Sequence, residues 1–173
     1  MDIFKPSLSN TILEEMSLAC SMSTNYAGNI IVNLANLPEF LRKPILEKRL
    51  LEFFSMSHED KKEIITNALQ AGPTISFDKF SILFRTWLEI LSKLPEENRK
   101  IMFGTYLTEI ISHPEKLVMF NLDGILEAYL TLSKEQKDAI SSTIRDLVRT
   151  LDENSKKRLF LIIPEKAKNE IGI

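Results

Sequence analysis

The sequence is poor in cysteine, histidine and glycine, and it lacks any long apolar run. Cys20 is the only cysteine, so no intramolecular disulfide can form, and no signal-peptide pattern opens the chain. We therefore expect a reducing, cytoplasmic environment. No apolar stretch reaches the roughly 18 residues that a membrane-spanning helix requires, which predicts no membrane insertion. The five glycines are scattered and form neither GxxxxGK nor GxGxxG, so nucleotide binding has no support.

Residues that could bind a metal or act as a nucleophile are few and far apart. His58 and His113 each lie at an expected helix start, and neither belongs to an HExxH motif or a zinc-type cluster. Cys20 has no nearby histidine or basic side chain that would favour its thiolate. We predict no cofactor, no metal site and no catalytic residue.

The charges are nearly balanced. Lysine and arginine number 22 against 24 aspartates and glutamates, a formal net charge of −2, which does not favour nucleic acid as the partner. Apolar residues make up 44% of the chain and charged residues 27%, as in ordinary globular proteins. At 173 residues, the chain is predicted to form a single domain, 1–173.

From Leu37 onward, the sequence repeats every 19 residues. The units begin LPEFLRKPIL at 37, MSHEDKKEII at 56, ISFDKFSILF at 75, LPEENRKIMF at 94, HPEKLVMFNL at 113, LSKEQKDAIS at 132 and LDENSKKRLF at 151. In each unit the second position holds a residue that begins helices, and an acidic residue follows in the first turn. These helix-start residues are Pro38, Ser57, Ser76, Pro95, Pro114, Ser133 and Asp152.

The period belongs to whole units, because 19 residues of one continuous helix would rotate its apolar face away by about 100°. Each unit therefore predicts one helix and a short turn. Units richer in apolar residues, starting at 37, 75 and 113, alternate with poorer ones, which indicates a 38-residue helical hairpin.

The predicted fold is all-α, a right-handed α-α superhelix of antiparallel hairpins over 37–74, 75–112 and 113–150. Residues 1–36 would form N-terminal helices, within SNTILEEMSLACSM (9–22) and TNYAGNIIVNLAN (24–36), and residues 151–173 a C-terminal cap. A compact multi-helix bundle is the structural alternative.

The units, of the form LPEENRKIMFGTYL, resemble those of HEAT-like and armadillo-like solenoids over residues 37–163. They are also similar to the shorter helical superhelices of flagellar motor switch proteins and of cytoplasmic domains of bacterial magnesium channels. The resemblance rests on an apolar residue, a cap, acids and a leucine. It implies the fold and carries over no functional residues.

Two sets of residues are candidates for partner binding. Basic residues at equivalent positions, among them Lys62, Arg99, Lys100 and Lys137, could align as a ridge for acidic protein or phosphate, or form ordinary surface ion pairs with first-turn acids. Trp87 could anchor a partner if exposed, or pack between repeats. Paired acids such as Glu96 and Glu97 recur with the architecture, which favours helix capping over catalysis.

The predicted function is a non-enzymatic interaction module or scaffold, whose helical-repeat surface binds a protein or peptide. This prediction follows from the shape rather than from an identified site. A nucleic-acid-binding protein that uses the basic ridge is one alternative. An enzyme whose site joins residues distant in sequence is another.

Overall fold

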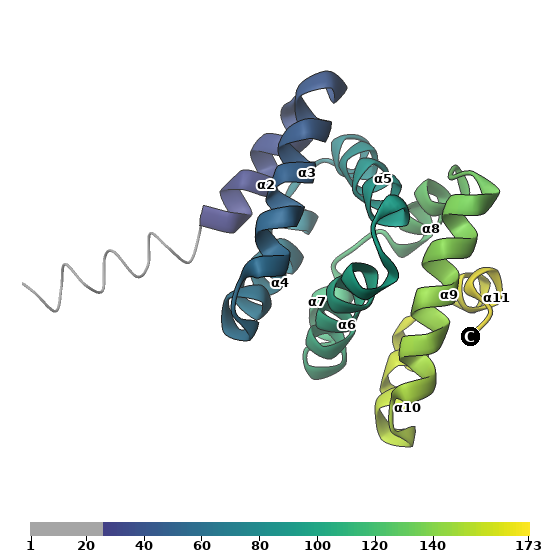
Figure 1. Ribbon diagram of the computed structural model, residues 1–173. Coiled ribbons are helices and arrows are strands. Elements are labelled where there is room, and N and C mark those ends of the chain that lie inside the picture. Colours follow the sequence, from purple (N-terminus) through teal and green to yellow (C-terminus); the bar gives the residue numbers. More distant parts are fainter. Residues whose placement is uncertain (1–25) are drawn as a thin grey trace, which may run out of the picture.

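The structure is a computed structural model that describes residues 26–173 (Figure 1). This part of the chain is all-helical and contains no strand. The helix expected within 9–22 and the start of the one expected within 24–36 lie outside the described residues.

The helices form two rows, and the chain passes along them from one end of the molecule to the other (Figure 1). One row contains α2 (Tyr26–Asn36), α4 (His58–Ala71), α6 (Glu96–Ser112) and α9 (Lys134–Thr150), each in contact with the next. The second row contains α3 (Glu39–Ser55), α5 (Phe77–Lys93) and α8 (Leu122–Leu130). A single 3-10 turn, η1 (Gly72–Thr74), precedes α5, and the short helix α7 (Glu115–Val118) precedes α8. At the C-terminal end, α10 (Glu153–Ile162) packs on α6, and α11 (Glu165–Ile171) packs on α9.

Helices begin where the sequence predicts. All seven predicted helix-start residues occupy N-cap positions: Pro38, Ser57, Ser76, Pro95, Pro114, Ser133 and Asp152. Ser133 and Gln136 form a complete capping box at the start of α9, and the Asp152 carboxylate accepts hydrogen bonds from two backbone N–H groups of α10. The short polar segments between helices therefore fix the helix boundaries locally.

The single helix expected after His113 is divided into α7 and α8. Phe120, between them, turns inward onto Phe80, with ring centroids 5.5 Å apart. Its ring lies so close to Gly72 that a Cβ there would be 2.5 Å from it. The Asn121 side chain then accepts a hydrogen bond from Gly124 N at 3.0 Å and begins α8. Tertiary packing of one aromatic ring thus interrupts the helix.

The core lies between the two rows and extends along their length. Its most deeply buried members, Ile65 on α4, Leu91 on α5 and Ile140 on α9, are at most 2% exposed. A second, smaller cluster of Ile111, Val148 and Leu159 joins the C-terminal helices. The inner faces of both rows therefore supply one long apolar interior, in which the candidate site lies.

Candidate functional site: an apolar cavity between the helix rows

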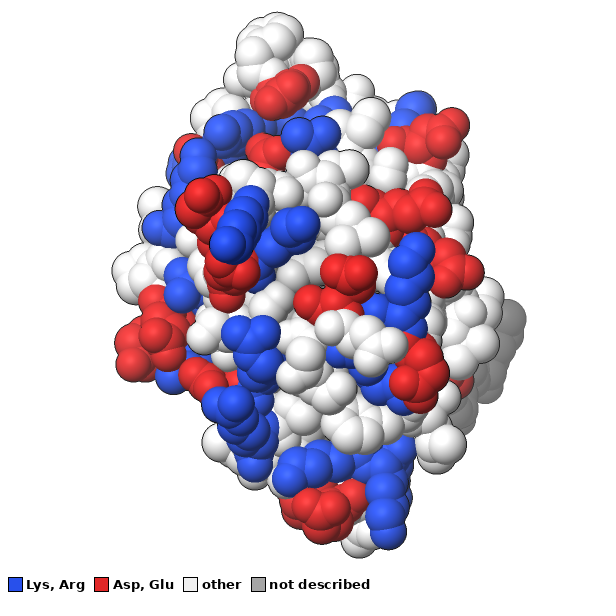
Figure 2. Space-filling view, turned by 90° about the vertical axis from the view of Figure 1, so that its right-hand side faces the viewer, with Lys and Arg blue, Asp and Glu red and all other residues white. Residues whose placement is uncertain are grey.

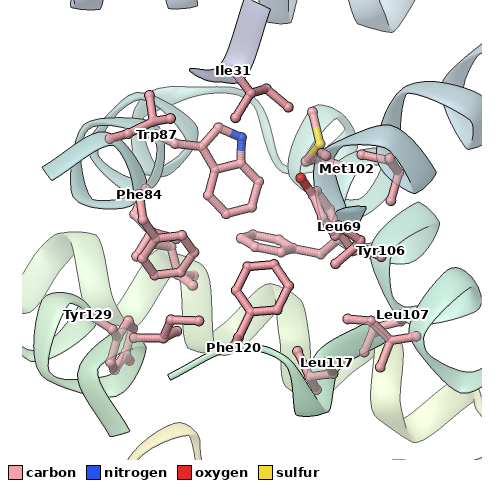
Figure 3. Close-up of a pocket in the computed structure, with 18 of the residues that line it drawn as sticks. Ile31, Leu69, Phe84, Trp87, Met102, Tyr106, Leu107, Leu117, Phe120 and Tyr129 are labelled. Carbon is pink, nitrogen blue, oxygen red and sulfur yellow. The ribbon is translucent and has the colours of Figure 1, made fainter. Parts of the chain in front are cut away.

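A cavity of about 500 Å³ lies between the two rows of helices. Every α-helix of the described chain contributes to its wall, from Ala27 on α2 to Ile171 on α11. Figure 3 shows part of this wall, including Ile31, Leu69, Phe84, Trp87, Met102, Tyr106, Leu107, Leu117, Phe120 and Tyr129. The lining is almost entirely apolar, which is typical of sites that bind apolar groups.

Arg49 and Glu52 on α3 are the only charged residues that line the cavity within the described chain. Their side chains are 44% and 37% exposed and form an ion pair of 2.7 Å. Because charged groups stay in contact with water, this pair marks a place where the cavity opens to solvent. The adjoining wall is formed by Leu50 and Phe53, which are buried.

Trp87 lies within an aromatic cluster that forms one side of the cavity. Its ring centroid is 5.6 Å from that of Phe84, 5.7 Å from that of Phe103 and 5.5 Å from that of Tyr106. The side chain is half-buried, and it points into the interior rather than away from the molecule (Figure 3). Trp87 therefore packs between α5 and α6 and also lines the cavity.

The cavity contains two polar groups without internal partners. The Tyr106 hydroxyl and the Trp87 indole N–H make no hydrogen bond to any described residue. Burial raises the pKa of Tyr106 far above its ordinary value, so its hydroxyl stays protonated and can donate a hydrogen bond. By contrast, the Tyr129 hydroxyl is satisfied by Ser141 Oγ at 2.5 Å. An occupant with one or two acceptor groups would therefore be oriented by Trp87 and Tyr106.

A buried carboxylate, Glu109 on α6, joins three helices. Its Oε1 accepts from Lys116 Nζ on α7 at 2.5 Å and from Thr66 Oγ1 on α4 at 2.8 Å. Burial alone would raise the pKa of Glu109, but these two hydrogen bonds and the charge of Lys116 hold it below its ordinary value. His113 Nε2 lies 4.0 Å from the same oxygen. The cluster is an internal ion pair that fixes α7 against α4 and α6.

The four basic candidates lie on three neighbouring helices of one row. Lys62 on α4 is exposed, and Lys100 on α6 pairs with Glu96 at 2.5 Å. Lys137 is half-buried in the first turn of α9. The guanidinium group of Arg99 is held in place, because its Nε donates to Thr143 Oγ1 at 3.0 Å and its Nη1 donates to the Leu94 carbonyl.

Arg99 therefore links α6 to α9. Arg42 on α3 makes one equivalent bond, to the carbonyl of Leu37 five residues earlier, and its Nε donates to the carbonyl of Leu34 on α2. On the face that Figure 2 shows, lysines and arginines alternate with aspartates and glutamates, without a field of one sign. The structure brings the basic candidates onto one row of helices but separates them from Trp87, which faces the cavity.

The histidines lie apart from the cavity. His58 is exposed, and the imidazole of His113 is 47% exposed, with Nδ1 3.4 Å from Glu115. Cys20 lies outside the described residues. Across residues 26–173, no group of three or more His, Cys, Asp or Glu side chains is arranged to hold a metal ion. No helix in that range has the length and apolarity that a membrane span requires.

Phe84, Tyr106 and Phe120 line the cavity, although nothing in the sequence assigned them to a site. The four-residue spacing of Phe80 and Phe84 could have indicated an aromatic face on α5. No protein-family model, curated protein or solved structure matches the chain.

Proposed function

We propose that this protein is a non-enzymatic interaction module of the cytoplasm, built as a right-handed superhelix of 38-residue helical hairpins. In this proposal, its cavity receives the apolar face of an amphipathic helix from a partner protein. The observation that carries the proposal is the continuous apolar lining, to which all the described α-helices contribute.

The contacts between helices support the superhelix. Along the first row, α2 packs on α4, α4 on α6 and α6 on α9, while α3 packs on α5 and α5 on α8. Each of these partners is the equivalent helix of the next hairpin when α7 and α8 count as one unit. Such neighbour-to-neighbour packing is typical of repeat arrays, whose curvature creates extended concave binding surfaces.

The form of the cavity supports an elongated apolar occupant. Its wall includes residues from Ala27 to Ile173, so it extends along the array. An amphipathic helix places apolar side chains at three- and four-residue intervals along one side, which suits such a groove. The unpartnered groups of Trp87 and Tyr106 would hydrogen-bond a polar side chain at the edge of that apolar face.

Site-specific photo-crosslinking in cells that express the protein tests this function. A benzophenone amino acid replaces Leu107 or Ile31 in the cavity wall, and Leu161, which is 88% exposed on α10, in a control variant. We expect the same protein to be cross-linked from both cavity positions and not from Leu161. Cross-linking of no protein from the cavity, or of the same proteins from all three positions, would refute the proposal.

A substitution that fills the cavity provides a second, independent test of the proposed function. Ala68→Trp places an indole in the cavity wall of α4. We expect it to abolish the cavity-specific cross-link while circular dichroism shows unchanged helix content. If the cross-link persists in a variant with native helix content, the partner binds elsewhere.

A further inference from the structure

Two hydrogen-bond donors in the cavity wall face the same space. The Trp87 and Tyr106 rings meet edge to face, with their centroids 5.5 Å apart. In Figure 3 the Trp87 nitrogen and the Tyr106 oxygen both point toward the side of the cavity where Ile31 lies. On the basis of the function proposed above, we propose that this pair selects a partner helix with one uncharged acceptor oxygen, such as that of a glutamine or threonine side chain.

The surroundings of the two donors leave them for an occupant to satisfy. Neither group has a hydrogen-bond partner among the described residues. The rings of Phe84 and Phe103 flank Trp87 at centroid distances of 5.6 and 5.7 Å and offer no conventional acceptor. A buried donor without a partner costs free energy, so an occupant that supplies an acceptor at this point binds more tightly than one that does not.

The chemistry of the two donors defines the group that satisfies both. An indole N–H can only donate, and burial raises the pKa of Tyr106, which keeps its hydroxyl protonated. A carbonyl or hydroxyl oxygen has two lone pairs and can accept from both donors at once. The side chains of lysine and arginine only donate, so they would leave the Trp87 N–H unsatisfied.

The charge of the cavity wall favours an uncharged oxygen over a carboxylate. Arg49 is the only basic residue in the wall formed by the described chain, and it is paired with Glu52 at the opening. Burial of a carboxylate without a cation in apolar surroundings costs far more than hydrogen bonds from two neutral donors return. An acidic side chain at this point would therefore weaken binding.

This selection can be measured without knowledge of the partner, with naphthalene probes that differ in one group. The ketone probe is an acylnaphthalene, the alkyl probe has a methylene group in place of the carbonyl, and the acid probe has a carboxylate there. A cavity of about 500 Å³ is large enough for such probes, and their fluorescence gives the dissociation constants. In the wild-type protein, we expect the acid probe to bind more weakly than the ketone probe.

Tyr106→Phe removes one of the two donors and keeps the ring. It should weaken the ketone probe by about tenfold and leave the dissociation constant of the alkyl probe unchanged, because only the ketone loses a hydrogen bond. Trp87→Phe removes the other donor and should also weaken the ketone probe more than the alkyl probe. Thr108→Val is the control, because Thr108 is exposed on the same helix as Tyr106 and its hydroxyl donates to the Gly104 carbonyl.

Thr108→Val should leave both dissociation constants at their wild-type values, and circular dichroism should show native helix content in all three variants. If Tyr106→Phe weakened both probes equally or neither of them, the selection would be refuted while the proposed function stood. An acid probe that bound as tightly as the ketone probe would refute it in the same way. If neither the ketone nor the alkyl probe bound the wild-type protein, the cavity would admit no apolar group, and the proposed function would fail as well.

Discussion

Glu109 on α6 is a buried carboxylate that is hydrogen-bonded to α4 and α7. Its side chain is 2% exposed, its Oε1 is held by Lys116 and Thr66, and its Oε2 has no partner among the described residues. Removing one partner of a buried ion pair leaves an uncompensated charge. We expect Lys116→Met to lower the free energy of unfolding by about 3 kcal/mol at pH 7, measured by urea denaturation.

The stability difference between the wild-type protein and Lys116→Met should depend on pH. Because the pKa of Glu109 is lowered in the folded protein, its stabilisation is present above the ordinary carboxyl pKa and is lost as the pH falls through the folded value. In Lys116→Met, burial without the lysine should raise this pKa, so acid protonates Glu109 and relieves the unpaired charge. The difference between the two proteins should therefore shrink toward pH 4. Lys62→Met, an exposed control on α4, should change stability little at either pH.

Arg99 and Lys100 are adjacent basic residues with different structural roles. Arg99 bonds to Thr143 and to the Leu94 carbonyl, whereas Lys100 forms a surface ion pair with Glu96. We expect Arg99→Met to lower the free energy of unfolding by about 2 kcal/mol, since hydrogen bonds to a charged group are lost at a half-buried site. Lys100→Met should change the free energy of unfolding little, because its ion pair is exposed to solvent. If urea unfolding showed that both variants lose the same free energy of unfolding, Arg99 would not link α6 to α9 as described.

The sequence identified Arg99 and Trp87 as notable residues but could not assign their surroundings. A basic residue after a first-turn acid looks the same whether it points to solvent or, like Arg99, reaches a neighbouring helix. The environment of Trp87 depends on Phe103 and Tyr106, which a separate helix supplies. Such contacts are set by tertiary packing, and a periodic pattern does not encode them residue by residue.

At the scale of helices, the starts were predictable because capping is local. The side chains of Ser57, Ser133 and Asp152 accept hydrogen bonds from backbone N–H groups two or three residues later, so a short stretch of sequence contains the signal. Proline begins helices through its fixed φ, which is also a local property. The division between α7 and α8 was not predictable in this way. It depends on Phe120 meeting Phe80 and Gly72, from segments far away in the sequence.

Two helical glycines allow a matched test of close packing. A Cβ at Gly124 on α8 would lie 2.1 Å from the Phe77 ring, whereas a Cβ at Gly104 on α6 would have its nearest neighbour at 3.7 Å. We expect Gly124→Ala to destabilise the protein by about 2 kcal/mol, because the Phe77 ring must move away from the buried Gly124 backbone that it contacts. Gly104→Ala should instead stabilise it by up to about 1 kcal/mol through higher helix propensity. Melting temperatures that shift in the same direction for both variants would contradict this account of the α5–α8 contact.

At the scale of the molecule, the sequence predicted an all-helical chain, and the structure confirms this for residues 26–173. The cavity was not predictable, because its volume is what remains after every inner side chain has been placed. The alternation of apolar-rich and apolar-poor units nevertheless carries part of the information. It distinguishes the α3, α5 and α8 row from the α4, α6 and α9 row before any contact is known.

A superhelix and a compact bundle should differ in the free energy at which their individual helices unfold locally. In a linear array each unit is stabilised mainly by its neighbours, so terminal units unfold at lower free energy than central ones. α5 packs against α2, α3, α6, α8 and α9, whereas α11 packs mainly against α9. We therefore expect native-state hydrogen exchange to be fastest in α11 and slowest in α5, with α4 and α6 between them. A compact bundle that unfolds as one unit would give α5 and α11 the same opening free energy, and that outcome would contradict the proposed superhelix.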